Sequence, residues 1–393
     1  MLSIKVLPQT NLRQDYAHSV LISLLRGLAA LVVAAAHLRA QSFPAFGSVI
    51  GPSLSFQVLA FVSGFAHQAV VVFFLLSGWL VGGSFLNKYG REHAIRDYAI
   101  DRLTRLWIVL VPTFLAILAF GAITGKIDPA TANMATDNDY SATAFLGNLL
   151  GLQNMLVPTF GGNFPLWSLS NETWYYVLFP LLVVGWRPAT TTQRVLAAGG
   201  VAILGIFALL LNGPVLLYFS IWLLGAAASR IKITAAPLAK SFMLFLFVGL
   251  ASYFRLKGKN NGMAYDAFVQ DAIFSVAFVC FLCSTQVPIS VDSIFHQSAR
   301  RVGKFFADFS FTLYVLHVPL IGGIVFFSST LSTRRLSPHS ATDMAIYLGS
   351  FVLIVAISYL FHLPFEANTQ RLRTFFKRNV AQQKIGLQGS VES

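Results

Sequence analysis

Apolar runs of membrane-spanning length recur along almost the whole chain, and they limit what it can fold into. A run of about 20 apolar residues is long enough to cross the hydrocarbon core of a bilayer as a helix. Run length therefore predicts an all-α integral membrane protein, a bundle of about ten transmembrane helices. The expected spans are residues 19–40, 67–86, 104–124, 171–186, 194–211, 213–229, 238–254, 266–284, 308–328 and 343–363.

The composition agrees with a chain that lies almost entirely in a membrane. Hydrophobic residues make up 56% of the sequence and charged residues only 11%, whereas a soluble protein carries roughly 25% charged residues. The stretches between apolar runs are loops, so we expect no separate soluble domain.

The positive charge follows the loops between the apolar runs. The net charge is +13, but basic residues recur in short segments, which is typical of a topology signal and not of a nucleic-acid partner. With the N-terminus inside, twenty of the 28 Lys and Arg residues fall on the cytoplasmic side, seven fall outside and Arg26 lies within a span. This bias predicts that both termini are cytoplasmic. The loop with Arg255, Lys257 and Lys259 goes against it.

Two further apolar stretches are not expected to span. Residues 43–66 contain Pro44 and Gly51, which favour an irregular or re-entrant segment. Residues 143–157 are apolar but too short to cross a bilayer.

Arg26 and His37 lie inside the first apolar run, and this pair is the strongest pointer to a function. A charged or titratable group in hydrocarbon costs roughly 2.5 kcal/mol or more and usually marks a functional site. Eleven residues at about 100° each return close to one helix face, about 16 Å further along the axis. We therefore expect both side chains to point into one cavity. The plainer alternative is an interfacial arginine and a histidine near the outer headgroups.

Two motifs follow, one in the second span and one in the basic loop of residues 96–107 that leads into the third. Ser77-Gly78, after two phenylalanines and two leucines, allows close helix approach and offers a hydroxyl, although simple packing explains it equally well. Arg102 and Arg105 are three residues apart, so they are neighbours on one helix face. Paired guanidinium groups suit phosphates, and the alternative is an anchor for anionic lipid.

A polar and aromatic cluster surrounds Glu172, at the expected outer mouth of the fourth span. Its other members are Trp167, Ser170 and Tyr176. The carboxylate is suited to orienting an imidazole or binding sugar hydroxyls, and the aromatic rings to stacking on a sugar. The alternative is an aromatic belt with a solvated glutamate.

A second intramembrane histidine occurs near the C-terminus. His317 and Tyr314 are three residues apart, on one face and well inside an apolar run. An intramembrane histidine again favours a functional interpretation, and a hydrogen-bonded structural histidine is the alternative.

This inventory of residues suits general base catalysis of transfer to a hydroxyl, because imidazole has a pKa near working pH. No motif matches a hydrolase elbow, a phosphate-binding glycine loop or a zinc site, and we expect no metal. Cys280 and Cys283 lie in one apolar run and are expected to be two buried thiols.

Taken in order, these motifs resemble the membrane-bound acyltransferase family 3, the O-acyltransferases that modify bacterial surface polysaccharides. The resemblance covers about residues 20–378. The matching motifs are Arg-x10-His at Arg26 and His37, Phe-Phe-x-Leu-Ser-Gly at 73–78, Arg-x-x-Arg at 102–105, Leu-Trp-Ser-Leu-Ser-x-Glu at 166–172 followed by Tyr176, and Ser-x-x-x-Tyr-x-x-His-x-Pro at 310–319.

The resemblance implies one membrane acyltransferase domain over residues 1–393, with short cytoplasmic tails, and an acyl-CoA donor, usually acetyl-CoA. It implies that His37 is the catalytic base or carries the acyl group, and that Arg26, Arg102 and Arg105 bind the donor. Glu172 would assist His37 in catalysis. The supporting residues of the site would be Ser77, Trp167, Ser170, Tyr176, Tyr314 and His317.

The chain departs from the family pattern at several positions. Ser23 stands where an Asp often precedes the first arginine, and Val70-Val71-Val72 replaces a common Gly-Val-Asp. The proline that usually closely follows Arg-x-x-Arg arrives late, at Pro112. Near the C-terminus Glu-x-Pro reads His362-Leu-Pro, with Glu366 displaced.

We therefore expect an enzyme that moves an acetyl or short acyl group from acyl-CoA to a hydroxyl of a cell-surface or exported saccharide, in a bacterial inner membrane. No permanently bound cofactor is expected, and the partners are the donor, the saccharide and membrane lipids. A glycan or lipid-linked sugar transporter, with Arg26 and His37 along its pathway, is one alternative. N-acyl transfer to an amino sugar is the other.

Overall fold

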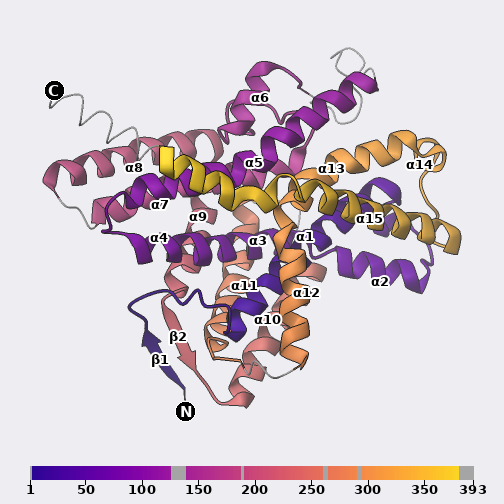
Figure 1. The fold of residues 1–393 in the computed structure, drawn as a ribbon. Coiled ribbons are helices and arrows are strands. Elements are labelled where there is room, and N and C mark those ends of the chain that lie inside the picture. Colours follow the sequence, from indigo (N-terminus) through magenta and orange to yellow (C-terminus); the bar gives the residue numbers. More distant parts are fainter. Residues whose placement is uncertain (1, 125–138, 187–189, 260–263, 290–293, 380–393) are drawn as a thin grey trace.

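Helices form most of the chain in this computed structural model, which describes residues 2–124, 139–186, 190–259, 264–289 and 294–379. Figure 1 shows α2 and α14 at one end of the molecule and α4 at the opposite end. The helices are α1 (Ala17–Ser42), α2 (Leu54–Ser63), α3 (Ala66–Ser77), α4 (Gly83–Lys88), α5 (Ala94–Ile123), α6 (Ala142–Leu149), α7 (Trp167–Trp186), α8 (Thr191–Asn212), α9 (Pro214–Ala228), α10 (Pro237–Lys257), α11 (Tyr265–Ser284), α12 (Ile294–Asp308), α13 (Ser310–Phe327), α14 (Ser329–Thr333) and α15 (Ala341–His362).

The protein is a multi-pass membrane protein by the length and apolar character of its helices. Within the described ranges, eight helical stretches are long and apolar enough to cross a membrane. They include α1, α5, α8, α10, α11 and α13, the run from α2 to α4, and the run that begins with α15. Of the other two expected spans, α9 is apolar but has only 15 residues, and α7 is not among the eight. The count of ten spans and the cytoplasmic placement of both termini stay predictions.

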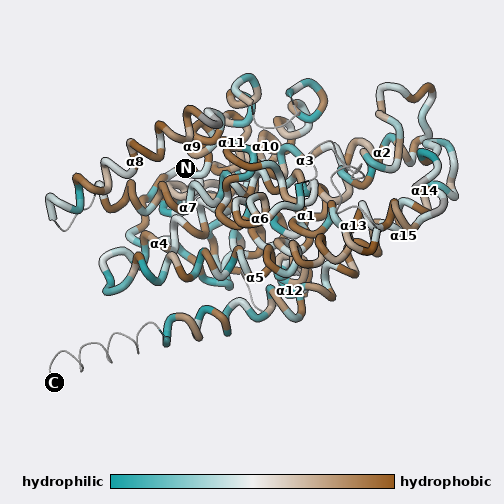
Figure 2. Tube along the Cα trace, turned by 90° about the horizontal axis from the view of Figure 1, so that it is seen from above, coloured by the Kyte–Doolittle hydropathy of each residue, from teal (hydrophilic) through white to brown (hydrophobic). Residues whose placement is uncertain are grey.

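The outer surface of several helices is apolar, as a protein in lipid requires. Figure 2 shows hydrophobic residues along α8, α13 and α15. No residue of α10, which is described throughout, is buried within the protein. Apolar side chains without a protein partner on such helices are expected to face lipid tails.

The segments between the expected spans agree only in part with the structure expected from the sequence. Residues 43–53 contain a 3₁₀ turn, as expected for an irregular segment, whereas Leu54–Ser63 form helix α2, which belongs to the second membrane-spanning stretch. Residues 96–107, expected as a loop before the third span, are helical and belong to α5. Lys126, Arg187 and Lys384, which entered the charge count, lie outside the described residues.

The helix α12 was not expected, because its sequence is too polar for a span. It packs along α1, and the two helices approach closely at two glycines. A Cβ added at Gly27 would lie 2.5 Å from Cβ of Phe306, and one at Gly303 would lie 3.0 Å from Cγ of Leu24. The helix α12 is amphipathic and packs against α1, which explains why this polar segment is helical without crossing the lipid.

A small sheet corrects the all-α expectation. Strand β1 (Ser3–Val6) pairs antiparallel with β2 (Ile231–Thr234), so that Ser3 lies opposite Thr234. The segment after β1 is then held by Thr10, whose hydroxyl lies 2.8 Å from that of Ser229. The alternation of apolar and polar residues in these four-residue strands is too short to stand out beside the helical runs.

The run from α3 to α4 contains a π-helical turn, η2 (Gly78–Gly82), that packs against α9. A Cβ added at Gly78 would overlap the carbonyl oxygen of Trp222, and one added at Gly225 would overlap that of Leu75. Glycines let helix backbones approach this closely in membranes. The close approach expected at Ser77-Gly78 is therefore present, and it places Ser77 beside the cavity described next.

Candidate active site

The middle of the helix bundle holds a cavity of about 550 Å³ that is rich in charged side chains. This lies in the range of roughly 300–1,000 Å³ typical of small-molecule sites. Helices α1, α3, α5, α7, α12 and α13 and the segment after α15 form its walls. The charged lining residues are Arg26, Arg102, Arg105, Glu172, Lys304, Asp308, Glu366 and Arg373. Five basic groups against three acidic ones favour an anionic ligand.

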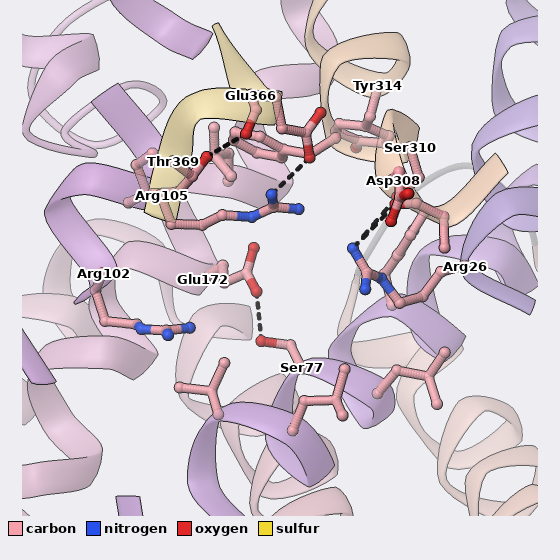
Figure 3. Close-up of a pocket in the computed structure, with 18 of the residues that line it drawn as sticks. Arg26, Ser77, Arg102, Arg105, Glu172, Asp308, Ser310, Tyr314, Glu366 and Thr369 are labelled. Carbon is pink, nitrogen blue, oxygen red and sulfur yellow. Dashed lines mark hydrogen bonds and ion pairs between the residues drawn. The ribbon is translucent and has the colours of Figure 1, made fainter. Parts of the chain in front are cut away.

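One of these arginines is already paired with a carboxylate. The guanidinium of Arg105 lies 2.6 Å from Oε1 of Glu366, whose side chain is buried. The other oxygen of Glu366 accepts hydrogen bonds from the backbone N–H and the hydroxyl of Thr312, at 3.0 and 2.7 Å. The arrangement fixes Arg105 in place at the wall of the cavity (Figure 3).

Arg102 has no carboxylate partner among the described residues. Its guanidinium carbon lies 5.8 Å from the ring centre of Tyr98 and 5.6 Å from that of Tyr176. Its Nε is buried and makes no hydrogen bond within the described ranges. A guanidinium held by aromatic rings and free of an acidic partner is available to an anion.

Arg26 is held only loosely by the protein. Its terminal nitrogen lies 3.4 Å from both the carbonyl oxygen of Ala307 and the hydroxyl of Ser310. Figure 3 shows its guanidinium pointing into the same space as those of Arg102 and Arg105. The three arginines that the sequence predicted to bind a donor therefore line one cavity.

Glu172 also faces this cavity, where sequence reasoning had expected it beside His37 at the outer mouth of its span. Its carboxylate accepts hydrogen bonds from the hydroxyl of Ser77 and, at 2.6 Å, from that of Tyr176. The indole N–H of Trp222 donates in turn to the Ser77 oxygen, at 3.1 Å. In this structure Glu172 is thus a fixed wall of the arginine cavity and is not hydrogen-bonded to an imidazole.

Helix geometry explains which residues of α7 reach the cavity. Relative to Glu172, Ser168 and Tyr176 lie within about 40° around the helix, at about 100° per residue. Trp167 and Ser170 lie on the far side, and neither lines the cavity. The hydroxyl of Ser170 instead donates to the carbonyl oxygen of Gly151, at 2.6 Å. Ser168, which the sequence reasoning did not select, takes the place expected for Ser170.

His37 and His317 form a pair that brings α1 and α13 together. Nδ1 of His37 lies 2.7 Å from Nε2 of His317, and the two ring planes are nearly parallel, with their centroids 5.0 Å apart. His317 is fully buried. The imidazole that sequence reasoning called supporting is therefore the direct partner of the one it called catalytic.

The hydrogen bonds of this pair assign its protons. Nδ1 of His317 lies 2.8 Å from the carbonyl oxygen of Tyr314, which only accepts, so this nitrogen carries a proton. Nε2 of neutral His317 then accepts, and His37 donates from Nδ1. The remaining nitrogen of His37, Nε2, keeps a lone pair and makes no hydrogen bond with any described residue. That is the state required of a general base.

The histidine pair and the arginine cavity are neighbours, with Tyr314 between them. Tyr314 lines the cavity, and its ring centre lies 5.9 Å from that of His317. Its hydroxyl is fixed 2.6 Å from that of Ser168. His37 itself is not among the residues that line the cavity. The expectation that Arg26 and His37 point into one cavity is therefore wrong. Arg26 lines the arginine cavity, and His37 lies in the neighbouring histidine pair.

Several residues of the cavity were missed by sequence reasoning. Glu366 was noted only as a displaced residue, Asp308 and Ser310 only as parts of a motif, and Arg373 only in the charge count. Glu366 carried a usable signal, because an acidic group directly follows the last apolar run. In the described part of the chain, no group of three His, Cys, Asp or Glu residues is placed to hold a metal ion.

The fold and the site together define a multi-pass membrane protein with a cationic cavity beside a buried histidine pair. Comparison with protein families then identifies the chain. Residues 20–363 match the model of the acyltransferase family 3, described as an acyltransferase domain. The chain belongs to this family and is a membrane acyltransferase. Searches of curated proteins and of solved structures found no match.

Proposed function

We propose that this acyltransferase moves an acetyl or short acyl group from acyl-CoA to a hydroxyl of a cell-surface or exported saccharide. The observation that carries the proposal is the cavity lined by Arg26, Arg102 and Arg105, next to a histidine with a free lone pair. Coenzyme A carries several phosphate groups, and guanidinium groups bind phosphates with charge-assisted hydrogen bonds. Arg102, free of an acidic partner in the described ranges, is the leading candidate for that contact.

The chemistry assigned to His37 follows from its free nitrogen. Nε2 takes the proton of the acceptor hydroxyl while the oxygen attacks the thioester carbonyl carbon. The carbon–sulfur bond then breaks, and the departing coenzyme A sulfur receives the proton from His37. A transient acyl group on Nε2, passed on to the hydroxyl afterwards, uses the same atom and remains the alternative.

The separation of the two parts of the site suits an extended donor. His37 follows Arg26 by eleven positions, which corresponds to about 16 Å along α1. With its phosphates at Arg26 and Arg102, the donor would direct its flexible arm past Tyr314 toward His37. The arginines would then position the donor, and the histidine pair would act on its thioester.

The first experiment measures transfer of label from radiolabelled acetyl-CoA into the glycan fraction of membranes. His37→Ala should lower the rate by roughly 10²- to 10⁴-fold, the usual contribution of a general base. The matched control is His339→Ala, which removes an exposed histidine that does not line the arginine cavity and should leave the rate unchanged. Equal label in His37→Ala and wild type, at matched expression, would remove His37 from the mechanism.

The same assay separates the proposal from its alternatives. Glycan movement without modification, and no label in wild type, would favour a transporter. Labelled product that resists alkali would indicate an amide, and alkali-labile product an ester. The proposed location is a bacterial inner membrane, with the saccharide and the surrounding lipids as partners.

A further inference from the structure

A second, smaller cavity adjoins the arginine cavity at the N-terminal end of α1. It has a volume of about 270 Å³ and shares Arg26 and Arg102 with the main cavity. Residues 11–14, the first turns of α1 and the turn from η2 into α4 form its other walls. We call this space the annex.

Three of the residues that line the annex carry a buried polar atom that lacks a partner. Nδ1 of His18, Nε1 of Trp79 and Nε of Arg102 make no hydrogen bond with any residue in the described ranges. His18 is 0% and Trp79 1% exposed. Buried polar groups are almost always hydrogen-bonded, and leaving one unpaired is costly. Three such atoms around one cavity indicate that a ligand completes them.

The hydrogen bonding of His18 defines what the ligand must offer. Its Nε2 lies 3.0 Å from the carbonyl oxygen of Asn11, so Nε2 carries the proton and Nδ1 accepts. The indole N–H of Trp79 can only donate. The two ring centres are 5.9 Å apart. The annex therefore has an acceptor and a donor on two neighbouring rings, and two arginines also line it.

We propose that the annex binds a part of the acyl donor that presents an N–H beside a hydrogen-bond acceptor. The proposal rests on the proposed function, because acyl-CoA supplies that chemistry from two sources. One is the edge of the adenine ring, and the other is the amide of the pantetheine arm nearest the phosphates, from which the rest of the arm would continue toward His37. Both adjoin the phosphates that Arg26 and Arg102 are placed to hold.

Trp79→Phe tests the annex with the smallest change, because it keeps an aromatic ring and removes only the donor. Binding of acetyl-CoA, of adenosine 3′,5′-bisphosphate and of acetyl-pantetheine is measured on the purified full chain. We expect the variant to bind acetyl-CoA roughly three- to tenfold more weakly, the usual effect of one hydrogen bond. One of the two fragments should also bind Trp79→Phe more weakly than wild type. That fragment identifies which part of the donor occupies the annex.

The matched control is Trp174→Phe. Trp174 is also buried, but its N–H donates to the carbonyl oxygen of Gly151, and it does not line the annex. This variant should bind acetyl-CoA as wild type does. Equal binding by wild type and Trp79→Phe would overturn the proposal and indicate that water alone fills the annex.

A ligand-side test does not depend on how the variant folds. In 1,N6-etheno-CoA the donor–acceptor edge of adenine is blocked. Weaker binding of this analogue to wild type supports the adenine source. Two results together would overturn the proposal for the annex. Etheno-CoA would bind wild type as tightly as acetyl-CoA does, and acetyl-pantetheine would bind Trp79→Phe as tightly as it binds wild type. Binding without acetyl transfer would overturn the proposed function alone, whereas no binding of acetyl-CoA to wild type would overturn both.

Discussion

At the scale of single residues, side chains of one type have different environments and so different roles. Arg105 is paired with buried Glu366, whereas Arg102 lies against two tyrosine rings and has no acidic partner among the described residues. A paired guanidinium has its charge largely compensated and acts mainly in the architecture of the wall. An unpaired one retains its attraction for an anion. Arg102 is therefore the more direct candidate for donor binding.

The histidine pair gives a prediction at this scale. His317→Leu removes the acceptor for Nδ1–H of His37, so His37 is no longer held in one tautomer and orientation. We expect kcat to fall by roughly 10- to 100-fold, a smaller loss than that for a deleted general base. KM for the donor should stay unchanged, because His317 does not line the arginine cavity. Steady-state kinetics of acetyl transfer provide both values.

His317→Gln is the conservative comparison. The amide oxygen of Gln accepts a hydrogen bond as Nε2 does, so this variant should recover part of the lost kcat. Wild-type kcat in His317→Leu would show that the pair does not orient His37. If kcat falls equally in His317→Leu and His317→Gln and both variants bind the donor more weakly, the role of His317 is structural.

At the scale of elements, a close contact between the α3–η2 run and α9 supports the site. It positions Ser77, which bonds Glu172 and accepts from Trp222 of α9. The π-helical turn inserts one extra residue into the hydrogen-bonding pattern of the helix at this point. Such turns are frequent at functional sites. The contact depends on residues without a Cβ.

Gly78→Ala tests this contact. The added methyl would overlap the carbonyl oxygen of Trp222, so the helices must separate. Overpacking of this kind costs about 1–3 kcal/mol, and the unfolding midpoint in detergent should fall accordingly. Acetyl transfer should fall as well, because Ser77 moves with the helix.

The matched control for this substitution is Gly199→Ala, in α8. Nothing lies within 4 Å of a Cβ added there, and alanine favours a helix over glycine by about 0.5–1 kcal/mol. Stability should therefore be unchanged or slightly higher. An unfolding midpoint that does not distinguish Gly78→Ala from Gly199→Ala would contradict the role assigned to the close contact.

At the scale of the whole molecule, residues from distant parts of the chain build one site. Arg26 comes from the first helix, Glu172 from the middle and Glu366 from the segment after the last long helix. The strand β1, near the N-terminus, is tied to β2 between α9 and α10. The positive-inside bias predicts that this sheet lies on the cytoplasmic side, the side on which the proposed acyl-CoA donor is made.

Topology is the prediction at this scale. In a background of Cys280→Ser and Cys283→Ser, a cysteine at Lys5 should react with a membrane-impermeant maleimide only after the membrane is opened. A cysteine at Ser48, between α1 and α2, should react in intact cells. Both positions are exposed, so reactivity reports the side of the membrane. The background protein without added cysteine is the control, and the reverse pattern would invert the proposed orientation.

The sequence by itself determined the membrane class, most of the helices and the family. These depend on local properties: the length of apolar runs, the spacing of motifs and their order along the chain. Arg26, Arg102 and Arg105 could be selected because a charge beside or within an apolar run is costly and therefore informative. Helix geometry also places Arg26 and His37 on one face of α1.

Only the tertiary structure decided which side chains meet. His37 and His317 are 280 residues apart, and Ser77 and Glu172 are 95 apart. No local pattern predicts that the Glu172 carboxylate is bonded to Ser77 in the cavity and that His37 instead pairs with His317. The annex likewise depends on an N-terminal segment held in place by a sheet with a strand more than 200 residues away. Such contacts follow from how helix faces pack against one another, and the spacing of residues within a single helix carries no record of that packing.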